Sequence, residues 1–530
     1  MSKNRTDTET KLSDTEIYKR SKRGFLRVIF GRTSIIILLL VFQFALIFSL
    51  FARFEEYISV IYGASATLSA LVVLYVANTD DSPEVKLSWS ALIILAPVFG
   101  SLLYLFVQLE IGHRVMNRIL RRVLFQTKKY SIRNEQLSEE MKKHNKQLYN
   151  MSEYLFLAGN FSAYTNVKTQ YYPSGEKMFK SMLDELEKAQ KFIFLEYFII
   201  EEGEMWGKIL EILKRKANEG VEIRVLYDGT CAVTLLPYRY PTTLSKLGIK
   251  CRMFSPLRPF VSTHYNNRDH RKFMIIDGKV AFTGGVNIAD EYINAKEKHG
   301  HWKDSGIMLS GEAVNSCTLM FLQMWNIGPG KEDYDKYLTF EENTQPCANG
   351  YIIPYAASPL NNDKIGETVY LDIINTALEY VYIMTPYLII DNEMTQALIN
   401  ASKRGVDVRI VLPSVPDHKI AQAIAKSHYR ELTDAGVKIY EYTPGFIHSK
   451  VFVSDDIKAV VGTINLDYRS LYLHFENAVY MHGTESVFEI KCDFLETFEA
   501  STLINIADVR RQGVLAHLKN GFLRLLAPLM

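Results

Sequence analysis

The sequence predicts an α/β protein of two similar halves that share one active site, preceded by an N-terminal α-helical membrane region. Three observations predict this architecture. A motif of His, Lys, Asp, Gly and Asn occurs twice with identical spacing. Apolar runs alternate with helical patterns around each copy, and long stretches poor in charge precede both. A chain of 530 residues also exceeds one ordinary domain.

Changes in composition along the chain set the expected boundaries. The segment from 328 to 350 clusters Gly, Pro, Glu and Asp and is typical of a connection between the halves. In chain order we expect a basic N-terminal tail (1–32), a transmembrane region (33–109), a basic and helical juxtamembrane linker (110–165), the first half (166–345), the second half (346–510) and an apolar C-terminal tail (511–530).

The membrane region contains three apolar stretches, Thr33–Ala52, Tyr57–Ala77 and Leu87–Val107. Each has about 20 residues, enough to cross a hydrocarbon core of about 30 Å as a helix. Basic residues flank the region on both sides, and the positive-inside rule places both flanks in the cytoplasm. Three full crossings would separate the flanks, so one stretch is expected to be re-entrant, interfacial or incompletely spanning. We expect a multi-pass cell-membrane protein with a cytoplasmic catalytic region.

The linker that follows has apolar residues at helical spacing after a basic segment. Two interpretations stand with equal weight, a helix drawn to anionic headgroups and a solvated linker helix. The apolar C-terminal tail is expected to pack on the catalytic region or to touch the bilayer.

Each half repeats the order strand, helix, strand, helix, short strand, motif strand. Phe192–Ile200 corresponds to Tyr380–Ile390, and Arg215–Asp228 corresponds to Ala401–Pro413. Apolar runs of about six residues that alternate with helical periodicity indicate an α/β fold with a largely internal sheet. Two such halves that face each other would bring both motifs into one cleft.

The repeated motif supplies the candidate catalytic residues. They are His270, Lys272 and Asp277 in the first half and His448, Lys450 and Asp455 in the second, followed by the candidate phosphate-binding residues Asn287 and Asn465. On a strand, residues i and i+2 point the same way, so His and Lys project into one site. A single His-x-Lys is usually a solvated surface pair, but the repetition argues against that reading. Within the motif, the aspartates are expected to fix loops rather than perform chemistry.

These residue types suit a phosphodiester. Neutral imidazole can attack phosphorus, and charged imidazole can protonate a leaving oxygen, so two histidines can divide the work. Two lysines and two amides can stabilise the charge that builds on the phosphate oxygens. No metal and no cofactor is required, and the five cysteines have no metal-ligand spacing. A net charge of +2 does not indicate a nucleic-acid partner.

The doubled motif resembles the HKD signature of the phospholipase D superfamily, and the chain is most similar to its bacterial cardiolipin synthase branch. The resemblance covers nearly the whole chain, although many members have two transmembrane helices rather than three apolar stretches. The phrases that carry it include Asn267-Arg-Asp-His270-Arg-Lys272, Thr385-Pro386-Tyr387, Gly445-Phe-Ile-His448-Ser-Lys450 and Asn465-Leu-Asp467-Tyr-Arg469-Ser470.

The resemblance implies two phospholipase D-like halves and a lipid substrate at a bilayer. The implied reaction converts two phosphatidylglycerol molecules into cardiolipin and glycerol through a phosphohistidine, with His270 as nucleophile and His448 as acid and base. It also implies that Asp304 orients His270 and that Glu476 orients His448, since each acid lies downstream of that histidine. The motif cannot separate this reaction from that of a membrane phospholipase D or a phosphatidylserine synthase. A nuclease-like or inactive scaffold is the alternative from another class, and the oligomeric state stays open.

Overall fold

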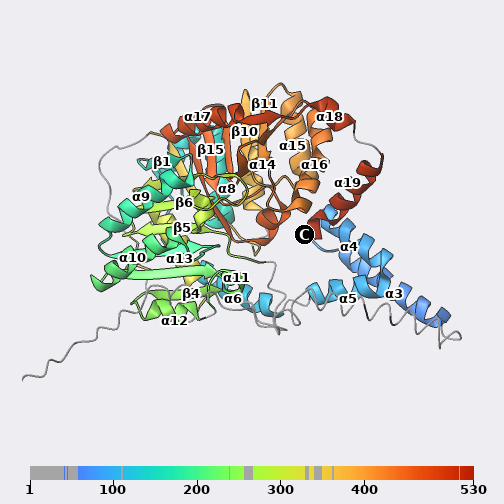
Figure 1. Ribbon diagram of the computed structural model, residues 1–530, viewed down its shortest axis with the longest axis horizontal. Coiled ribbons are helices and arrows are strands. Elements are labelled where there is room, and N and C mark those ends of the chain that lie inside the picture. The colour runs from blue at the N-terminus through green and yellow to red at the C-terminus, as the bar shows by residue number, and fades with distance from the viewer. Residues whose placement is uncertain are drawn as a thin grey trace, which may run out of the picture.

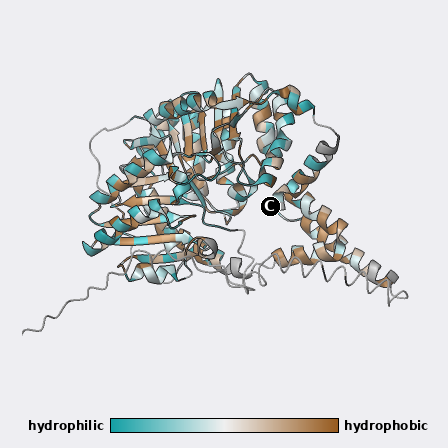
Figure 2. Cartoon of the chain, viewed as in Figure 1, coloured by the Kyte–Doolittle hydropathy of each residue, from teal (hydrophilic) through white to brown (hydrophobic). Residues whose placement is uncertain are grey.

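The computed structural model describes residues 58–108, 111–237, 239–255, 267–328, 334–338, 349–360, 363–511 and 514–529, together with Val41 and Ala45. Two mixed β-sheets form the centre of the molecule, and an N-terminal group of helices projects from one side (Figure 1). Brown, hydrophobic residues follow the strands and most of the projecting helices (Figure 2). The expected fold class, two α/β halves after a helical region, is confirmed.

The first half is built on a sheet of seven strands. Its parallel part continues the expected strand–helix–strand pattern, and the motif strand β5 pairs antiparallel with β2. In spatial order the strands are β1 (Lys168–Tyr172), β8 (Gly306–Ser310), β6 (Val280–Gly284), β5 (Lys272–Ile276), β2 (Phe192–Tyr197), β3 (Glu222–Asp228) and β4 (Lys250–Phe254).

The second half repeats this sheet and adds an edge strand. The motif strand β14 pairs antiparallel with β10, just as β5 pairs with β2. In spatial order the strands are β17 (Ser501–Leu503), β12 (Lys438–Tyr442), β11 (Asp407–Pro413), β10 (Tyr380–Met384), β14 (Val451–Ser454), β15 (Lys458–Gly462), β16 (Glu476–His482) and β9 (Tyr351–Ala357). A separate parallel pair joins β13 (Gly445–Ile447) of the second half to β7 (His301–Lys303) of the first.

Helices cover both sheets and interlock the halves. The first half contains α9 (Gly175–Lys188), α10 (Glu204–Asn218), α11 (Cys231–Thr234), α12 (Tyr240–Ser245), η4 (Asp290–Ile293) and α13 (Val314–Trp325). The second contains α14 (Ile365–Thr376), α15 (Asn392–Lys403), α16 (Lys419–Asp434), η5 (Arg469–Leu473), α17 (Glu485–Glu499) and α18 (Ile506–Arg510). Helix α13 contacts β9 of the other half, and α17 contacts β1. One hydrophobic core therefore runs through residues of both halves.

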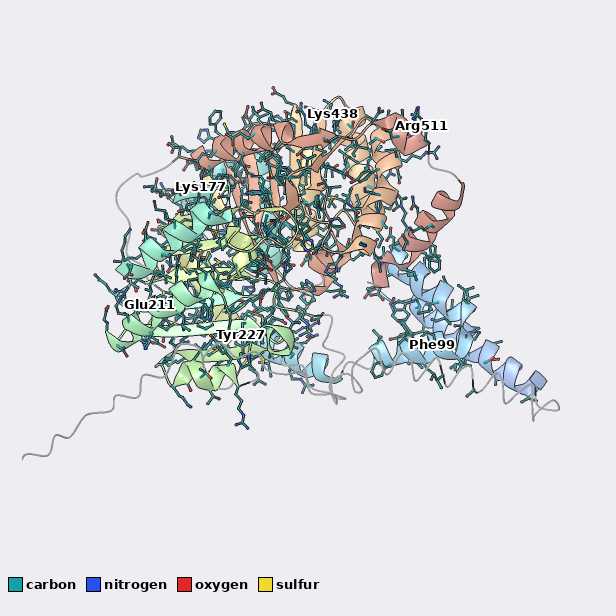
Figure 3. All side chains as sticks on the ribbon, viewed as in Figure 1. Phe99, Lys177, Glu211, Tyr227, Lys438 and Arg511 are labelled. Carbon is teal, nitrogen blue, oxygen red and sulfur yellow. The ribbon has the colours of Figure 1, made fainter. Side chains whose placement is uncertain are left out.

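Many charged side chains lie on the outside of this body. Figure 3 shows Lys177 and Glu211 on helices of the first half and Lys438 and Arg511 on the second, whereas Phe99 lies in the projecting helical group. Salt bridges between such surface charges contribute little to stability. The two sheets and their buried helices hold the site in place.

Before the first half, one helix extends over nearly all of the expected stretch Tyr57–Ala77, whereas another expected stretch is divided between two helices. The helices of this region are α3 (Ile58–Ala77), α4 (Pro83–Leu95), α5 (Pro97–Gln108), α6 (Ile111–Thr127), η3 (Lys128–Tyr130), α7 (Glu135–His144) and α8 (Lys146–Gly159). The expected continuous stretch Leu87–Val107 is divided, because Ala96 leaves helical geometry before Pro97. A residue before proline is disfavoured in the α region, and the proline ring cannot continue the helix.

Within the described residues, no helix is both long enough and apolar enough to cross a membrane. The expected stretch Thr33–Ala52 lies outside them except for two residues, so the three-stretch prediction is not confirmed. At the other end, α19 (Val514–Leu526) and η6 (Ala527–Leu529) contact α4, and α19 also contacts α16. The C-terminal tail thus packs between the helical group and the second half.

Candidate active site

The two motif histidines lie where the halves meet. His270 precedes β5, and its backbone N–H donates to the carbonyl of Phe475 at 2.9 Å. His448 follows β13, and its N–H donates to the carbonyl of Lys303 at 2.7 Å. Phe475 and Lys303 each come directly before a candidate orienting acid. Backbone pairing between the halves therefore sets each histidine beside the acid of the other half.

The side chains complete this crossed arrangement. The Nδ1 of His270 lies 2.8 and 2.9 Å from the two carboxylate oxygens of Glu476, and the Nδ1 of His448 lies 2.7 Å from Oδ2 of Asp304. The prediction that each acid orients the histidine upstream of it is wrong, because the partners are exchanged between the halves. An Nδ1–H bonded to a carboxylate leaves Nε2 free for chemistry.

Both motif lysines are buried beside these histidines. The Nζ of Lys272 donates to the carbonyl of His270 at 2.7 Å, and Lys450 donates to the carbonyl of His448. Burial lowers the pKa of Lys272 to about 7 and that of Lys450 to about 8. The charge of Lys450 acts on both Lys272 and His270, so the two motifs converge on one region.

Burial also controls the protonation of the histidines. Burial and then the charge of Lys272 hold the pKa of His270 well below its usual range, and burial with the charge of Lys450 lowers that of His448 to about 4. Burial tends to raise the pKa of both orienting acids. The contact with His448 holds the pKa of Asp304 below its usual value, whereas burial leaves the pKa of Glu476 well above its own. Both imidazoles are therefore neutral at pH 7 before an anion arrives.

The two asparagines differ in their surroundings. Asn287 donates from Nδ2 to the hydroxyl of Tyr292 at 2.8 Å, and its Oδ1 accepts from the N–H of Ile199 at 3.1 Å. Asn465 is buried as well, but its Oδ1 has no hydrogen-bond partner among the described residues. The Asn465 side chain is nevertheless hydrogen-bonded to the carboxyl group of Asp467, so each motif asparagine has a side-chain partner in its own half.

The motif aspartates lie at the other ends of the motif strands from the histidines. The carboxylate of Asp277 accepts from the N–H groups of residues 190–192 at 2.7–2.8 Å, and Asp455 accepts from those of residues 378–380 at 2.8–3.0 Å. Both residues have a φ of 54°, a left-handed conformation that Asp tolerates better than most residues. Each clamps the start of the neighbouring central strand, which agrees with the loop role expected from the sequence.

Sequence reasoning missed the aromatic and imidazole neighbours of the two histidines. His474 stands two residues before Glu476, as Trp302 stands two residues before Asp304. The ring centroids are 5.7 Å apart for His474 and His270, and 5.5 Å apart for Trp302 and His448. The repeat, extended two residues upstream of each acid, could have revealed this pair of equivalent positions.

His474 also brings together a group with metal-binding chemistry. Ligand atoms of His270, His474 and Glu476 lie within 4.8 Å of one another, although the sequence showed no such cluster. Burial lowers the pKa of His474 to about 3, and its ring nitrogens have no hydrogen-bond partner among the described residues. Lys272 acts on the same region with positive charge, which opposes a cation.

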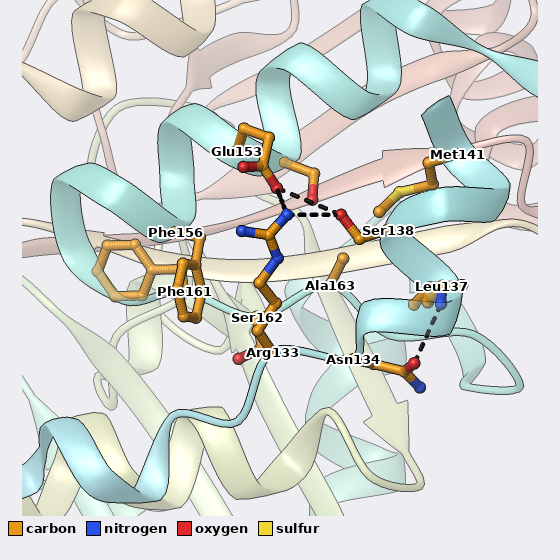
Figure 4. Close-up of a pocket in the computed structure, with 11 residues that line it drawn as sticks. Arg133, Asn134, Leu137, Ser138, Met141, Glu153, Phe156, Phe161, Ser162 and Ala163 are labelled. Atoms are coloured by element: carbon orange, nitrogen blue, oxygen red, sulfur yellow. Dashed lines mark hydrogen bonds and ion pairs between the residues drawn. The ribbon is translucent and has the colours of Figure 1, made fainter. Parts of the chain in front are cut away.

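A pocket elsewhere contains none of the candidate residues. It lies between α7 and α8, where Arg133 bridges Glu153 at 2.8 Å and Ser138 at 2.9 Å (Figure 4). Its polar groups largely bind one another, which is typical of a structural junction. The candidate residues gather instead in the buried region around the two histidines.

Comparison with known families agrees with this geometry. The family described as "Cardiolipin synthase, PLD-like domain" matches residues 182–325 and 370–498, and these two segments contain all ten candidate residues. The chain belongs to this cardiolipin synthase family. It is accordingly a phosphatidyltransferase of the phospholipase D superfamily. A second family, "Phospholipase_D-nuclease N-terminal", matches residues 66–108.

Relatives within the cardiolipin synthase family cover most of the chain. An uncharacterized protein of Streptococcus mutans is 48% identical over 86% of this chain and 99% of its own. A cardiolipin synthase of Alkalihalophilus pseudofirmus is 32% identical over 89% of this chain and 94% of its own. The phosphatidylserine synthase of Haemophilus influenzae, a solved structure, shares the fold with a TM-score of 0.56 and 12% identity, over 73% of this chain and 100% of that one.

Proposed function

We propose that this protein joins two phosphatidylglycerol molecules into cardiolipin and releases glycerol, through a phosphohistidine on His270. The observation that carries the proposal is the pair of crossed His–carboxylate contacts, which leaves two Nε2 atoms available at one site. Two buried lysines stand beside them to receive an anionic phosphate. Relatives named cardiolipin synthase support the choice of substrate.

The first step forms the covalent intermediate. The Nε2 lone pair of His270 attacks phosphorus, the bond from phosphorus to the glycerol oxygen breaks, and that oxygen takes a proton from Nε2 of His448. Positive charge that develops on the attacking ring favours the ionised form of Glu476, which accepts from Nδ1–H, although burial holds its resting pKa well above the usual value. His448 needs this proton although its resting pKa is about 4. The phosphate's negative charge offsets that of Lys450 and raises the pKa of His448 when substrate binds.

The second step releases the product. Neutral His448 accepts the proton of a headgroup hydroxyl on a second phosphatidylglycerol, and that oxygen attacks phosphorus. The bond between phosphorus and His270 breaks, and its electron pair returns to Nε2. Each step needs one histidine as nucleophile or leaving group and the other as acid or base, so the two crossed pairs suffice without a cofactor.

We further propose that Asn465, with Asn287, lies against the phosphate, and that the protein works at the cell membrane as a multi-pass protein with its catalytic half-domains in the cytoplasm. The match of residues 66–108 to an N-terminal region of this superfamily and the apolar sequence of α3 and α5 support membrane association. The lipid bilayer is then the partner that delivers both substrates.

The test uses the full chain with vesicles of phosphatidylglycerol alone. The proposal requires cardiolipin and glycerol in equal amounts. Phosphatidic acid as the main product would indicate a phospholipase D, and phosphatidylserine formed only on addition of serine together with a cytidine-diphosphate lipid would indicate the synthase. His270→Ala and His448→Ala serve as inactive controls.

A further inference from the structure

The two ends of the active site differ in one structurally equivalent position. In the first half, Ile200 pairs with Ile288, directly after Asn287. In the second half, Leu388 pairs with Leu466, directly after Asn465. The residue before each pairing position is Ile199 in the first half and Tyr387 in the second. A phenol thus stands in the second half where the first has an aliphatic side chain.

Tyr387 is coupled to a carboxylate. Its hydroxyl donates to Oδ2 of Asp417, which lies on the loop between β11 and α16. The Asp417 side chain is 20% exposed, and Nε2 of the exposed His418 ring lies 3.7 Å from its Oδ2. Among the described residues, the other carboxylate oxygen has no hydrogen-bond partner. The pair therefore offers an acceptor that the protein itself does not use.

This pair lies at the His448 end of the site. The charge of Asp417 acts on Lys450 and on Tyr292. Tyr292 packs edge-on against the ring of His448, with the centroids 5.3 Å apart. The His270 end has Phe198 and His474 against its imidazole instead. Asp417 therefore places a carboxylate with an unused oxygen beside the acid–base histidine.

In an in-line displacement, the leaving group departs on the side opposite the nucleophile, so a group beside His448 can contact it. If His270 attacks, the leaving glycerol departs next to His448, and the acceptor hydroxyl enters at the same place. Both groups are glycerol headgroups, so one subsite serves both steps. We propose that Asp417 and Tyr387 form this subsite and recognise a neutral vicinal diol by hydrogen bonds from its hydroxyls to the carboxylate. The inference rests on the proposed function.

The test measures acceptor choice. Full-chain protein in phosphatidylglycerol vesicles receives labelled glycerol and ethanol together, and the products are labelled phosphatidylglycerol, phosphatidylethanol and cardiolipin. Wild-type protein should prefer glycerol, because ethanol cannot bind the carboxylate with a second hydroxyl. In Asp417→Asn, the ratio of glycerol to ethanol product should fall about tenfold, the cost of one charge-assisted hydrogen bond. Tyr387→Phe should lower it less.

Asp434→Asn, at the far end of α16, is the matched control and should leave the ratio unchanged. An unchanged ratio in Asp417→Asn, or a wild-type protein that does not prefer glycerol, would overturn the subsite even if cardiolipin forms. Glycerol exchange that depends on Asp417, without any cardiolipin, would overturn the proposed function and leave the subsite standing. The two failures are therefore distinguishable.

Discussion

The crossed pairs predict that each acid acts on the chemistry of the histidine from the other half. Glu476→Gln should slow attack by His270, because the amide can accept from Nδ1–H but cannot stabilise the imidazolium charge. Asp304→Asn should instead impair proton transfer by His448. Both substitutions preserve side-chain shape, so each variant is the matched control of the other.

The contacts set the size of the effect. Each carboxylate lies 2.7–2.9 Å from Nδ1 of its histidine, within the range of a charge-assisted hydrogen bond. Such a bond contributes about 1.5–3 kcal/mol. If the contact is fully retained in the transition state, its loss slows the affected step about 10- to 150-fold. Both carboxyl groups are fully buried, but burial holds the pKa of Glu476 well above its usual value while that of Asp304 stays low, so the larger loss is expected for Asp304→Asn.

A donor with an activated leaving group separates the two effects. A phosphatidyl ester of a nitrophenol needs little acid assistance, so the rate of phosphatidyl-enzyme formation reports the nucleophile alone. In acid-quenched single turnovers, Glu476→Gln should show the full loss with this donor. Asp304→Asn should lose less than about threefold here, yet 10- to 150-fold with phosphatidylglycerol.

Peptide mapping of the trapped intermediate makes the test independent of which histidine attacks. The histidine that carries the lipid phosphate and the acid whose loss slows its formation must come from opposite halves. A label on His270 in an enzyme slowed chiefly by Asp304→Asn would refute the crossed assignment. A label on His448, in an enzyme whose phosphatidyl-enzyme formation is slowed chiefly by Glu476→Gln, would refute it as well.

Four other outcomes follow from the same geometry. His270→Ala should form no phosphatidyl-enzyme, whereas His448→Ala should accumulate it with an activated donor; a label on His448 that forms without His270 would reverse the roles. Activity should survive thorough chelation, and specific rescue by one divalent ion would contradict a metal-free mechanism. In pH profiles, kcat/KM should fall above pH 7 to 8, because Lys272 and Lys450 are charged only below their pKa values of about 7 and 8; a flat alkaline side to pH 9 would contradict this. Asp277→Ala should lower the free energy of unfolding by about 2–5 kcal/mol in urea titrations, and unchanged stability with lost activity would indicate a chemical role instead.

The repeat allowed much of the fold to be predicted, because local patterns determine it. The strand carrying Lys272 and the strand that follows Lys450 were readable from apolar runs that end in Asp277 and Asp455. The helix break before Pro97 also has a local cause, the proline itself. We did not predict this break, because the residues around Pro97 form one continuous apolar stretch. These features depend on neighbours within a few residues, which is the range over which sequence patterns are informative.

The partners of the histidines depend on contacts that no local pattern encodes. Glu476 follows His448 by 28 residues, and it lies 206 residues from His270, which it contacts. Closeness in sequence favoured pairing each histidine with the acid of its own half. That pairing is wrong, because backbone pairs between the halves decide which acid each histidine contacts. Those are the β13–β7 pair and the bridge from Asp269 to Phe475. His474 was missed for a related reason, since only the folded structure brings its ring next to that of His270.

The exchange of acids makes the two halves interdependent. In an uncrossed arrangement, each half would hold an oriented histidine by itself, and a shift between the halves would change only the distance between them. In the crossed arrangement, the bridge from Asp269 to Phe475 and the β13–β7 pair place each imidazole against the acid of the opposite half. The same backbone pairs thus assemble the site and set both histidine–acid contacts. A phosphodiester between the histidines meets two neutral rings, each held by the opposite half, and this geometry suits a reaction in which one ring attacks while the other supplies a proton.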